Sequence, residues 1–100
     1  MTDGYLLNLR KFREVRDDKA QALKPLEEAA EAFGAWQECE DMRFSPIMTA
    51  RRAYRDDLID KCLDTVQATV NLLAAVGATQ GEVDAAIRRM DERNGSRGRL

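Results

Sequence analysis

Carboxylate side chains are the residues of this sequence whose types and spacing could carry out chemistry. The chain contains no histidine, which excludes Ser-His-Asp and Cys-His catalysis. A zinc site is not expected either, because no cluster of thiolates replaces the missing imidazoles. The two cysteines, Cys39 and Cys62, lie far apart in the sequence and are interpreted as small apolar residues in a reducing compartment. Catalysis by this chain would therefore depend on Asp and Glu.

Two pairs of acidic residues have the spacing that brings carboxylates together on one face of a helix. Asp60 and Asp64 are four residues apart, and Glu28 and Glu31 are three apart. Like charges at this spacing repel each other unless a cation neutralises them. Hard divalent cations prefer oxygen ligands. The two pairs therefore predict a site for Mg²⁺, with Mn²⁺ as a possible substitute, between two packed helices, and Asn71 lies on the same helical stripe as Asp64.

Each acidic pair also has a purely structural interpretation. Glu27 and Glu28 follow Pro25 closely, and in the opening turn of a helix they would simply favour the helix dipole. Asp60 can form an ordinary surface ion pair with Lys61, worth less than about 1 kcal/mol. The convergence of acidic pairs from two adjacent helices favours the metal site over these alternatives.

The elements that must position these residues are predicted to be four helices, because apolar residues recur at helical spacing and β-branched residues are sparse. The first is expected over residues 6–20. The second begins at Pro25, whose fixed φ suits a first helical turn, and ends near Met42. Its apolar face carries Leu26, Ala29, Ala30, Phe33 and Trp36.

The third and fourth helices have recognisable end signals. Ser45 is predicted to cap the third helix, with Pro46 at its first position, and Gly77 ends this helix after Val76. The fourth helix starts at the capping box 79–82 and runs toward residue 93. On the third helix the predicted core face carries Ile59, Cys62, Leu63, Val66, Val70 and Leu73.

Composition places these helices in one domain, residues 1–100, of which residues 94–100 are expected to form a flexible basic tail. The chain is 44% hydrophobic and 34% charged, and a chain this short often completes its core as a homodimer or homotetramer. A net charge of −2 argues against stable binding to nucleic acid. No apolar run is long enough to span a bilayer, and the N-terminal residues lack the pattern of a signal peptide. We therefore expect a cytoplasmic protein that does not associate with a membrane.

The segment Glu28-Ala29-Ala30-Glu31, followed by Asp64, Asn71 and Gly77, resembles the MazG-like nucleotide pyrophosphohydrolases. The resemblance covers residues 24–99. That family has an ExxE pair on one helix and an ExxD pair on the next, then an asparagine seven residues later and a glycine six further on. The ending 92–99 also resembles the basic tail of small phage or prophage members. The combination of residues at this spacing is far more specific than ExxE alone.

The resemblance implies a Mg²⁺-dependent enzyme that cleaves a nucleoside triphosphate between the α and β phosphates, releasing a monophosphate and pyrophosphate. Glu28, Glu31 and Asp64 would hold the metal, and Glu28 or Glu31 would also accept a proton from the attacking water. Arg93, Arg97, Lys24 and Asn71 would contact the substrate, the alternative for the two arginines being a solvated tail. From its place on the apolar face of the second helix, Trp36 could stack on the base, but a lone Trp at this spacing more often packs in a core. The resemblance also implies a helical bundle assembled as a dimer or tetramer.

One departure from the family pattern concerns a metal ligand. The position three residues before Asp64, where the family has glutamate, is Lys61. Either Asp60 replaces the missing ligand or metal binding and catalysis are weakened or lost. In the second case the chain would be a catalytically inactive helical module that still binds nucleotides or a partner.

Overall fold

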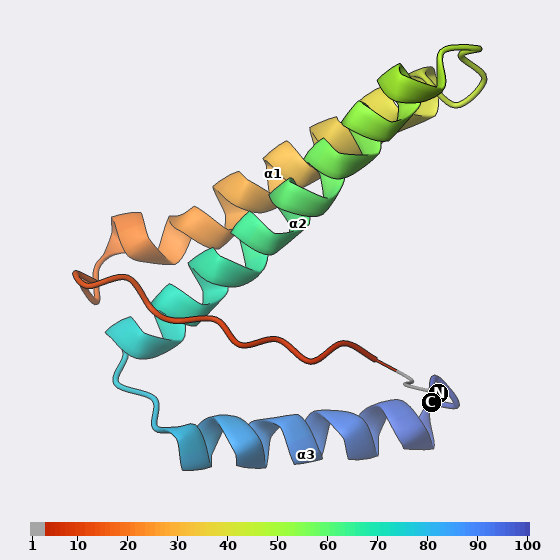
Figure 1. The fold of residues 1–100 in the computed structure, drawn as a ribbon. Helices are drawn as coiled ribbons and strands as arrows, with labels where there is room; N and C mark the ends of the chain where they lie inside the picture. The colour runs from red at the N-terminus through yellow and green to blue at the C-terminus, as the bar shows by residue number, and fades with distance from the viewer. Residues whose placement is uncertain (1–3) are drawn as a thin grey trace.

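The computed structural model describes residues 4–100, and in them the chain is all-helical, as predicted, with three helices. They are α1 (Lys19–Asp41), α2 (Met48–Ala75) and α3 (Gln80–Ser96). Helices α1 and α2 form a long antiparallel pair, and α3 turns away beneath them (Figure 1). Of the predicted single domain, residues 1–3 lie outside the described part.

The predicted first helix is not formed. Residues 4–18 are non-helical and run as an extended segment past the end of α2 (Figure 1), and we call this segment the strap. The spacing of Leu6, Leu9, Phe12 and Val15 fits a helix, but the strap instead bonds its backbone to side chains of α2: the N–H of Phe12 donates to Asn71, and the carbonyl of Arg10 accepts from Gln67. These backbone groups therefore find partners outside a helix.

Helix α1 begins earlier than Pro25, so the prediction of its start was wrong. Asp18 caps it, because the Asp18 Oδ1 accepts from the backbone N–H of Gln21 at 2.8 Å. Pro25 lies inside the helix, where it removes one backbone donor. Glu27 and Glu28 consequently lie in the third turn of α1 and not at its start, which removes their interpretation as helix-dipole residues.

The start of α2 also differs from its prediction. The helix begins at Met48 after Ile47, and Ser45 Oγ accepts from the N–H of Ile47 at 3.2 Å instead of capping a helix that starts at Pro46. The C-terminal signals are confirmed, since Gly77 has φ of +77° directly after α2. The capping box of Thr79 and Glu82 at the start of α3 is confirmed as well. Helix α3 ends at Ser96, three residues beyond the predicted end, so it includes the start of the expected tail.

The α1–α2 pair packs along a seam of small and polar side chains. The less exposed positions recur at alternating spacings of three and four, which is the spacing of two helices in knobs-into-holes contact. They are Gln21, Pro25, Glu28, Ala32, Ala35 and Cys39 on α1, and Leu58, Lys61, Thr65, Ala68, Leu72 and Ala75 on α2. Among the described residues, the buried ones are Ala35, Ala68 and Asn71. The Cys39 thiol donates across the seam to the carbonyl of Tyr54 at 3.2 Å.

The predicted apolar faces of the two helices are covered only in part. On α2, Leu63, Val66 and Val70 are half-buried, whereas Ile59, Cys62 and Leu73 are exposed. On α1, Leu26 and Phe33 remain 68% and 58% exposed. The spacing of these residues indicated an apolar stripe correctly, but in the single chain no other element covers its exposed residues. In the described part of the chain, α3 packs against neither α1 nor α2. No helix of residues 4–100 is both long and apolar enough to cross a membrane.

Candidate functional site

One hollow of about 560 Å³ lies where the strap crosses the α1–α2 pair, and we call it the strap hollow. It is formed by the strap, the first three turns of α1 and the C-terminal half of α2. Its lining residues are Phe12, Glu14, Arg16, Asp18, Ala20, Gln21, Lys24, Glu28, Asp64, Gln67, Ala68 and Asn71. Four of the residues proposed from sequence, namely Lys24, Glu28, Asp64 and Asn71, are therefore brought together.

Glu28 is the acidic residue of this hollow with the most perturbed environment. Its side-chain hydrogen bond with Glu31 raises the pKa of the Glu28 carboxyl above its ordinary value. Desolvation and the negative charges of Glu31 and Asp64 raise this pKa further, whereas the Lys24 ammonium lowers it. Glu31, on the same helix but not among the lining residues, and Asp64, on α2, therefore both lie close enough to act on the Glu28 carboxyl.

The donor chemistry of this group fits a hard divalent cation, but its geometry is incomplete. Repulsion among Glu28, Glu31 and Asp64 would be relieved by a cation, and carboxylate oxygens are the ligands that Mg²⁺ prefers. However, within residues 4–100 no three acidic or cysteine side chains converge closely enough to enclose a metal ion. Mg²⁺ usually retains waters and takes further oxygens from substrate phosphates, so a small number of protein carboxylates is compatible with such a site.

Asp60 and Lys61 lie away from the hollow. Asp60 is exposed, is not among the lining residues and has no influence on the Glu28 pKa. The structure therefore does not bring Asp60 to the other carboxylates as a replacement ligand. Lys61 is half-buried on the α1–α2 seam. Its carbonyl accepts from Thr65 Oγ1 at 3.0 Å.

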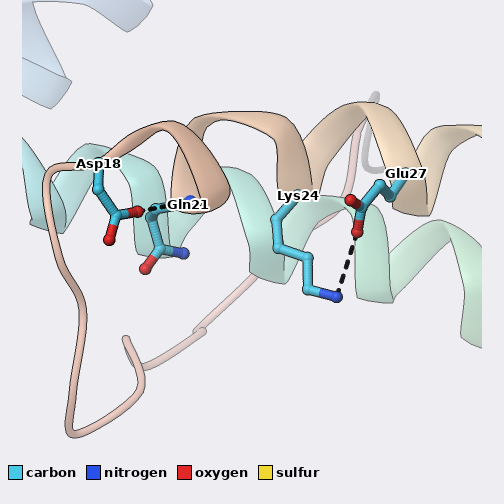
Figure 2. A network of polar contacts seen from close by, with 4 residues as sticks. All are labelled: Asp18, Gln21, Lys24 and Glu27. Carbon is cyan, nitrogen blue, oxygen red and sulfur yellow. Dashed lines mark hydrogen bonds and ion pairs between the residues drawn. The ribbon is translucent and has the colours of Figure 1, made fainter.

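Lys24 lines the hollow, but its ammonium group is held by a neighbour on the same helix. Lys24 Nζ lies 3.3 Å from Glu27 Oε2, in an ion pair whose two side chains are both more than half exposed. Figure 2 shows this pair on α1, with the Asp18–Gln21 cap one turn before it. An exposed pair of this kind is weak, worth less than about 1 kcal/mol, so Lys24 can exchange Glu27 for another anion.

The other predicted substrate contacts are not part of the strap hollow. Arg93 and Arg97 lie at the end of α3, which packs against neither of the helices that form the hollow in the described residues. Trp36 lies farther along α1 and stacks on Phe33 with 6.0 Å between ring centroids. It lines a different, shallower depression whose other residues include Glu38, Glu40 and Asp41.

Asn71 is the most buried polar residue of the described chain, with 3% of its surface exposed. Its Oδ1 accepts two hydrogen bonds, from the backbone N–H of Phe12 at 2.9 Å and from Gln67 Nε2 at 3.1 Å. Gln67 Nε2 also donates to the carbonyl of Arg10 at 2.7 Å. Asn71 thus joins the strap to α2 at the edge of the hollow.

Sequence reasoning missed the contribution of the strap. Phe12, Glu14, Arg16 and Asp18 all line the hollow, although the segment was predicted to be a helix with an apolar stripe. One signal was available: Asp18 and Gln21 have the spacing of a helix cap and its partner, which would have ended the non-helical segment at Asp18.

Comparison with protein-family models, with curated proteins and with solved structures finds no match to this chain. The resemblance to the MazG-like family therefore rests on its residue pattern alone and stays a prediction.

Proposed function

We propose that this chain is a Mg²⁺-dependent nucleoside triphosphate pyrophosphohydrolase of the MazG-like type, with its site in the strap hollow. The observation that carries the proposal is the grouping of Glu28, Glu31 and Asp64 across two helices, with Lys24 and Asn71 beside them. Of these residues, Glu28, Glu31, Asp64 and Asn71 are positions at which the sequence matches the family pattern. A purely structural helical bundle gives no reason for carboxylates of α1 and α2 to lie this close together, because like charges repel one another.

The proposed reaction is attack of water on the α phosphate of a nucleoside triphosphate, with pyrophosphate as the leaving group. When bound, Mg²⁺ supplies charge neutralisation and activates water. Glu28, Glu31 and Asp64 would hold the cation. One of the two glutamates, Glu28 or Glu31, is the proposed acceptor of the proton from the attacking water. Lys24 would exchange Glu27 for a phosphate oxygen.

The experiment that tests this proposal is a substrate panel. Purified chain is incubated with standard and modified ribo- and deoxyribonucleoside triphosphates, with Mg²⁺, with Mn²⁺ or with chelator, and the release of pyrophosphate is measured. The proposal predicts metal-dependent release of pyrophosphate together with the monophosphate. Release of orthophosphate, or no product from folded protein, would contradict it.

A second candidate function is nucleotide binding without catalysis. It is favoured by Lys61 at the position of a family metal ligand and by the absence, among residues 4–100, of three converging acidic or cysteine ligands. Lys61→Glu distinguishes the two functions. If Lys61 only replaces a lost metal ligand, the variant should release pyrophosphate faster or require less Mg²⁺. If the wild type is active and the variant has the same activity, the site functions without that ligand.

We also propose that the functional unit contains at least two copies of the chain. The accessible surface is 8334 Å², whereas a compact monomer of 11.3 kDa is expected to expose about 5,700 Å². The radius of gyration is 16.5 Å, against about 13 Å for a compact domain of this length. The surplus surface is comparable to what an obligate dimer buries per subunit, and it includes the apolar stripes of α1 and α2.

A further inference from the structure

The strap is fastened to α2 by two side chains that act on its backbone. Gln67 Nε2 donates to the carbonyl of Arg10 at 2.7 Å, and the N–H of Phe12 donates to Asn71 Oδ1 at 2.9 Å. Gln67 also donates to Asn71 Oδ1, which keeps both amide groups in place. Asn71 is buried, so its Oδ1 cannot replace a lost hydrogen bond with one to water. Detaching the strap would remove one of the two bonds to this oxygen and would therefore cost free energy.

Alternate residues of the fastened strap face the hollow. Phe12, Glu14 and Arg16 are among its lining residues, whereas Arg13 and Val15 are not. This period of two is the one that an extended backbone imposes on its side chains. The far end of the strap is fixed to the start of α1, because the N–H of Arg16 donates to Gln21 Oε1 at 3.3 Å and its carbonyl accepts from the N–H of Asp18 at 3.0 Å.

Arg16 is the cation of the hollow that has no carboxylate partner among residues 4–100, since Lys24 is paired with Glu27. An arginine guanidinium binds phosphate oxygens through two parallel hydrogen bonds, and it stays charged at every physiological pH. Arg16 faces the same hollow as Glu28 and Asp64. The hollow is also lined by Glu14 and Asp18. A ligand that contacts both Arg16 and the carboxylates of this hollow would be anionic where it meets Arg16 and would carry or attract a cation where it meets the carboxylates, as a metal-bound polyphosphate does.

We propose that the strap is part of the binding site, in which Asn71 and Gln67 hold its backbone so that Arg16 contacts the phosphate groups of a bound polyphosphate. Arg16 is then a binding residue supplied by the strap, and Asn71 is a positioning residue that acts through the strap. The proposal rests on the proposed function for the identity of the ligand. It assigns the phosphate contact to Arg16 and not to Arg93 on α3 or Arg97 directly after α3, neither of which lines the hollow.

The test measures binding without turnover. Inorganic triphosphate in the presence of Mg²⁺ is titrated into wild type, Arg16→Gln and the matched control Arg13→Gln by calorimetry. Loss of a charge-assisted contact is expected to weaken binding about tenfold or more in Arg16→Gln, and Arg13→Gln should bind within about twofold of wild type. Equal affinities for the two variants, or no binding by the wild type, would overturn the proposal.

The positioning role of Asn71 is tested by hydrogen exchange at the strap and by a double variant, which distinguish this role from a contribution to packing alone. Asn71→Ala is expected to speed hydrogen exchange at the Phe12 amide and to weaken triphosphate binding. The double variant Asn71→Ala/Arg16→Gln should lose little more triphosphate affinity than the weaker-binding single variant, because both substitutions affect the same contact between Arg16 and phosphate. If Asn71→Ala does not fold, Gln67→Ala removes the bonds to the Arg10 carbonyl and to Asn71 Oδ1, and it should produce the same pattern. Additive losses in a folded double variant, or an unchanged Phe12 amide, would overturn the positioning role.

The two levels of proposal fail differently. Arg16-dependent binding of triphosphate without pyrophosphate release from any nucleotide would reject the enzyme and retain the strap site. Pyrophosphate release that is unchanged in Arg16→Gln, with unchanged triphosphate affinity, would retain the enzyme and reject the strap site.

Discussion

Glu28 is the residue at which the packing of the helices and the proposed chemistry meet. It lies on the α1–α2 seam, shares a hydrogen bond with Glu31 and lies within the influence of Asp64. A carboxyl group in these surroundings gives up its proton less readily than an exposed one. The same crowding of carboxylates makes Glu28 a point of local destabilisation, as functional residues often are.

The raised pKa of Glu28 predicts a specific dependence of stability on pH in metal-free protein. The folded state holds this proton more tightly than the unfolded state, whose carboxyl titrates near 4.5. The free energy of unfolding should therefore fall as pH rises from about 4.5 through the higher, folded-state pKa of Glu28. Glu28→Gln should remove this part of the slope.

The measurement is denaturant unfolding of wild type and Glu28→Gln with chelator across pH 4 to 8. Taking the difference between the two proteins is necessary because the Glu82 pKa is lowered by its bonds to Thr79, which contributes stability at higher pH that is lost on acidification. Parallel curves for the two proteins would show that Glu28 is not perturbed in solution.

For the helices, the C-terminal end of α2 and the start of α3 were predicted correctly from sequence, whereas the helix faces that pack together were not. Gly77 and the capping box at Thr79 are local signals, in which one or two side chains satisfy the free backbone groups of a helix terminus. Because such signals involve only neighbouring residues, both were predicted correctly from the sequence. Pro25 was misleading because proline is tolerated inside a helix at moderate cost when tertiary contacts hold the helix together.

The strap could not be predicted from local pattern. Its apolar residues have helical spacing, but the bonds that fix its backbone come from Gln67 and Asn71, more than fifty residues later in the chain. The candidate site was therefore predicted on its helical side, at Glu28, Asp64 and Asn71, and was missed on its strap side. Asn71 was predicted to touch the substrate, and its observed contacts are with the strap.

The independence of α3 predicts that damage to its cap stays local. Thr79→Ala removes the capping box and should cost about 0.5–2 kcal/mol of helix stability. Because α3 packs on neither α1 nor α2 within residues 4–100, hydrogen exchange should accelerate in α3 while amides of the α1–α2 pair keep their protection. Thr69→Ala, at an exposed interior position of α2, is the matched control and should leave α3 unchanged. Simultaneous loss of protection in all three helices would contradict this independence.

For the whole molecule, the exposed apolar stripes predict self-association. Sedimentation should give at least twice the chain mass of 11.3 kDa. Ile59→Glu, which places a charge in the exposed apolar stripe of α2, should shift the equilibrium toward monomer. Ala53→Glu adds the same charge at an exposed position about 120° around α2 from Ile59, outside this stripe, and should leave the assembly intact. A monomeric wild type at micromolar concentration would contradict the proposed assembly.

The most direct test of the account compares Mg²⁺-dependent pyrophosphate release by wild type, Asp64→Asn and Asp60→Asn on the best substrate of the panel. Asp64 lines the strap hollow and acts on Glu28, whereas Asp60, one turn earlier on α2, does neither. The account predicts release by the wild type, a loss of about 100-fold or more in Asp64→Asn, and near-normal release in Asp60→Asn. No release by folded wild type, or equal rates in wild type and Asp64→Asn, would contradict it.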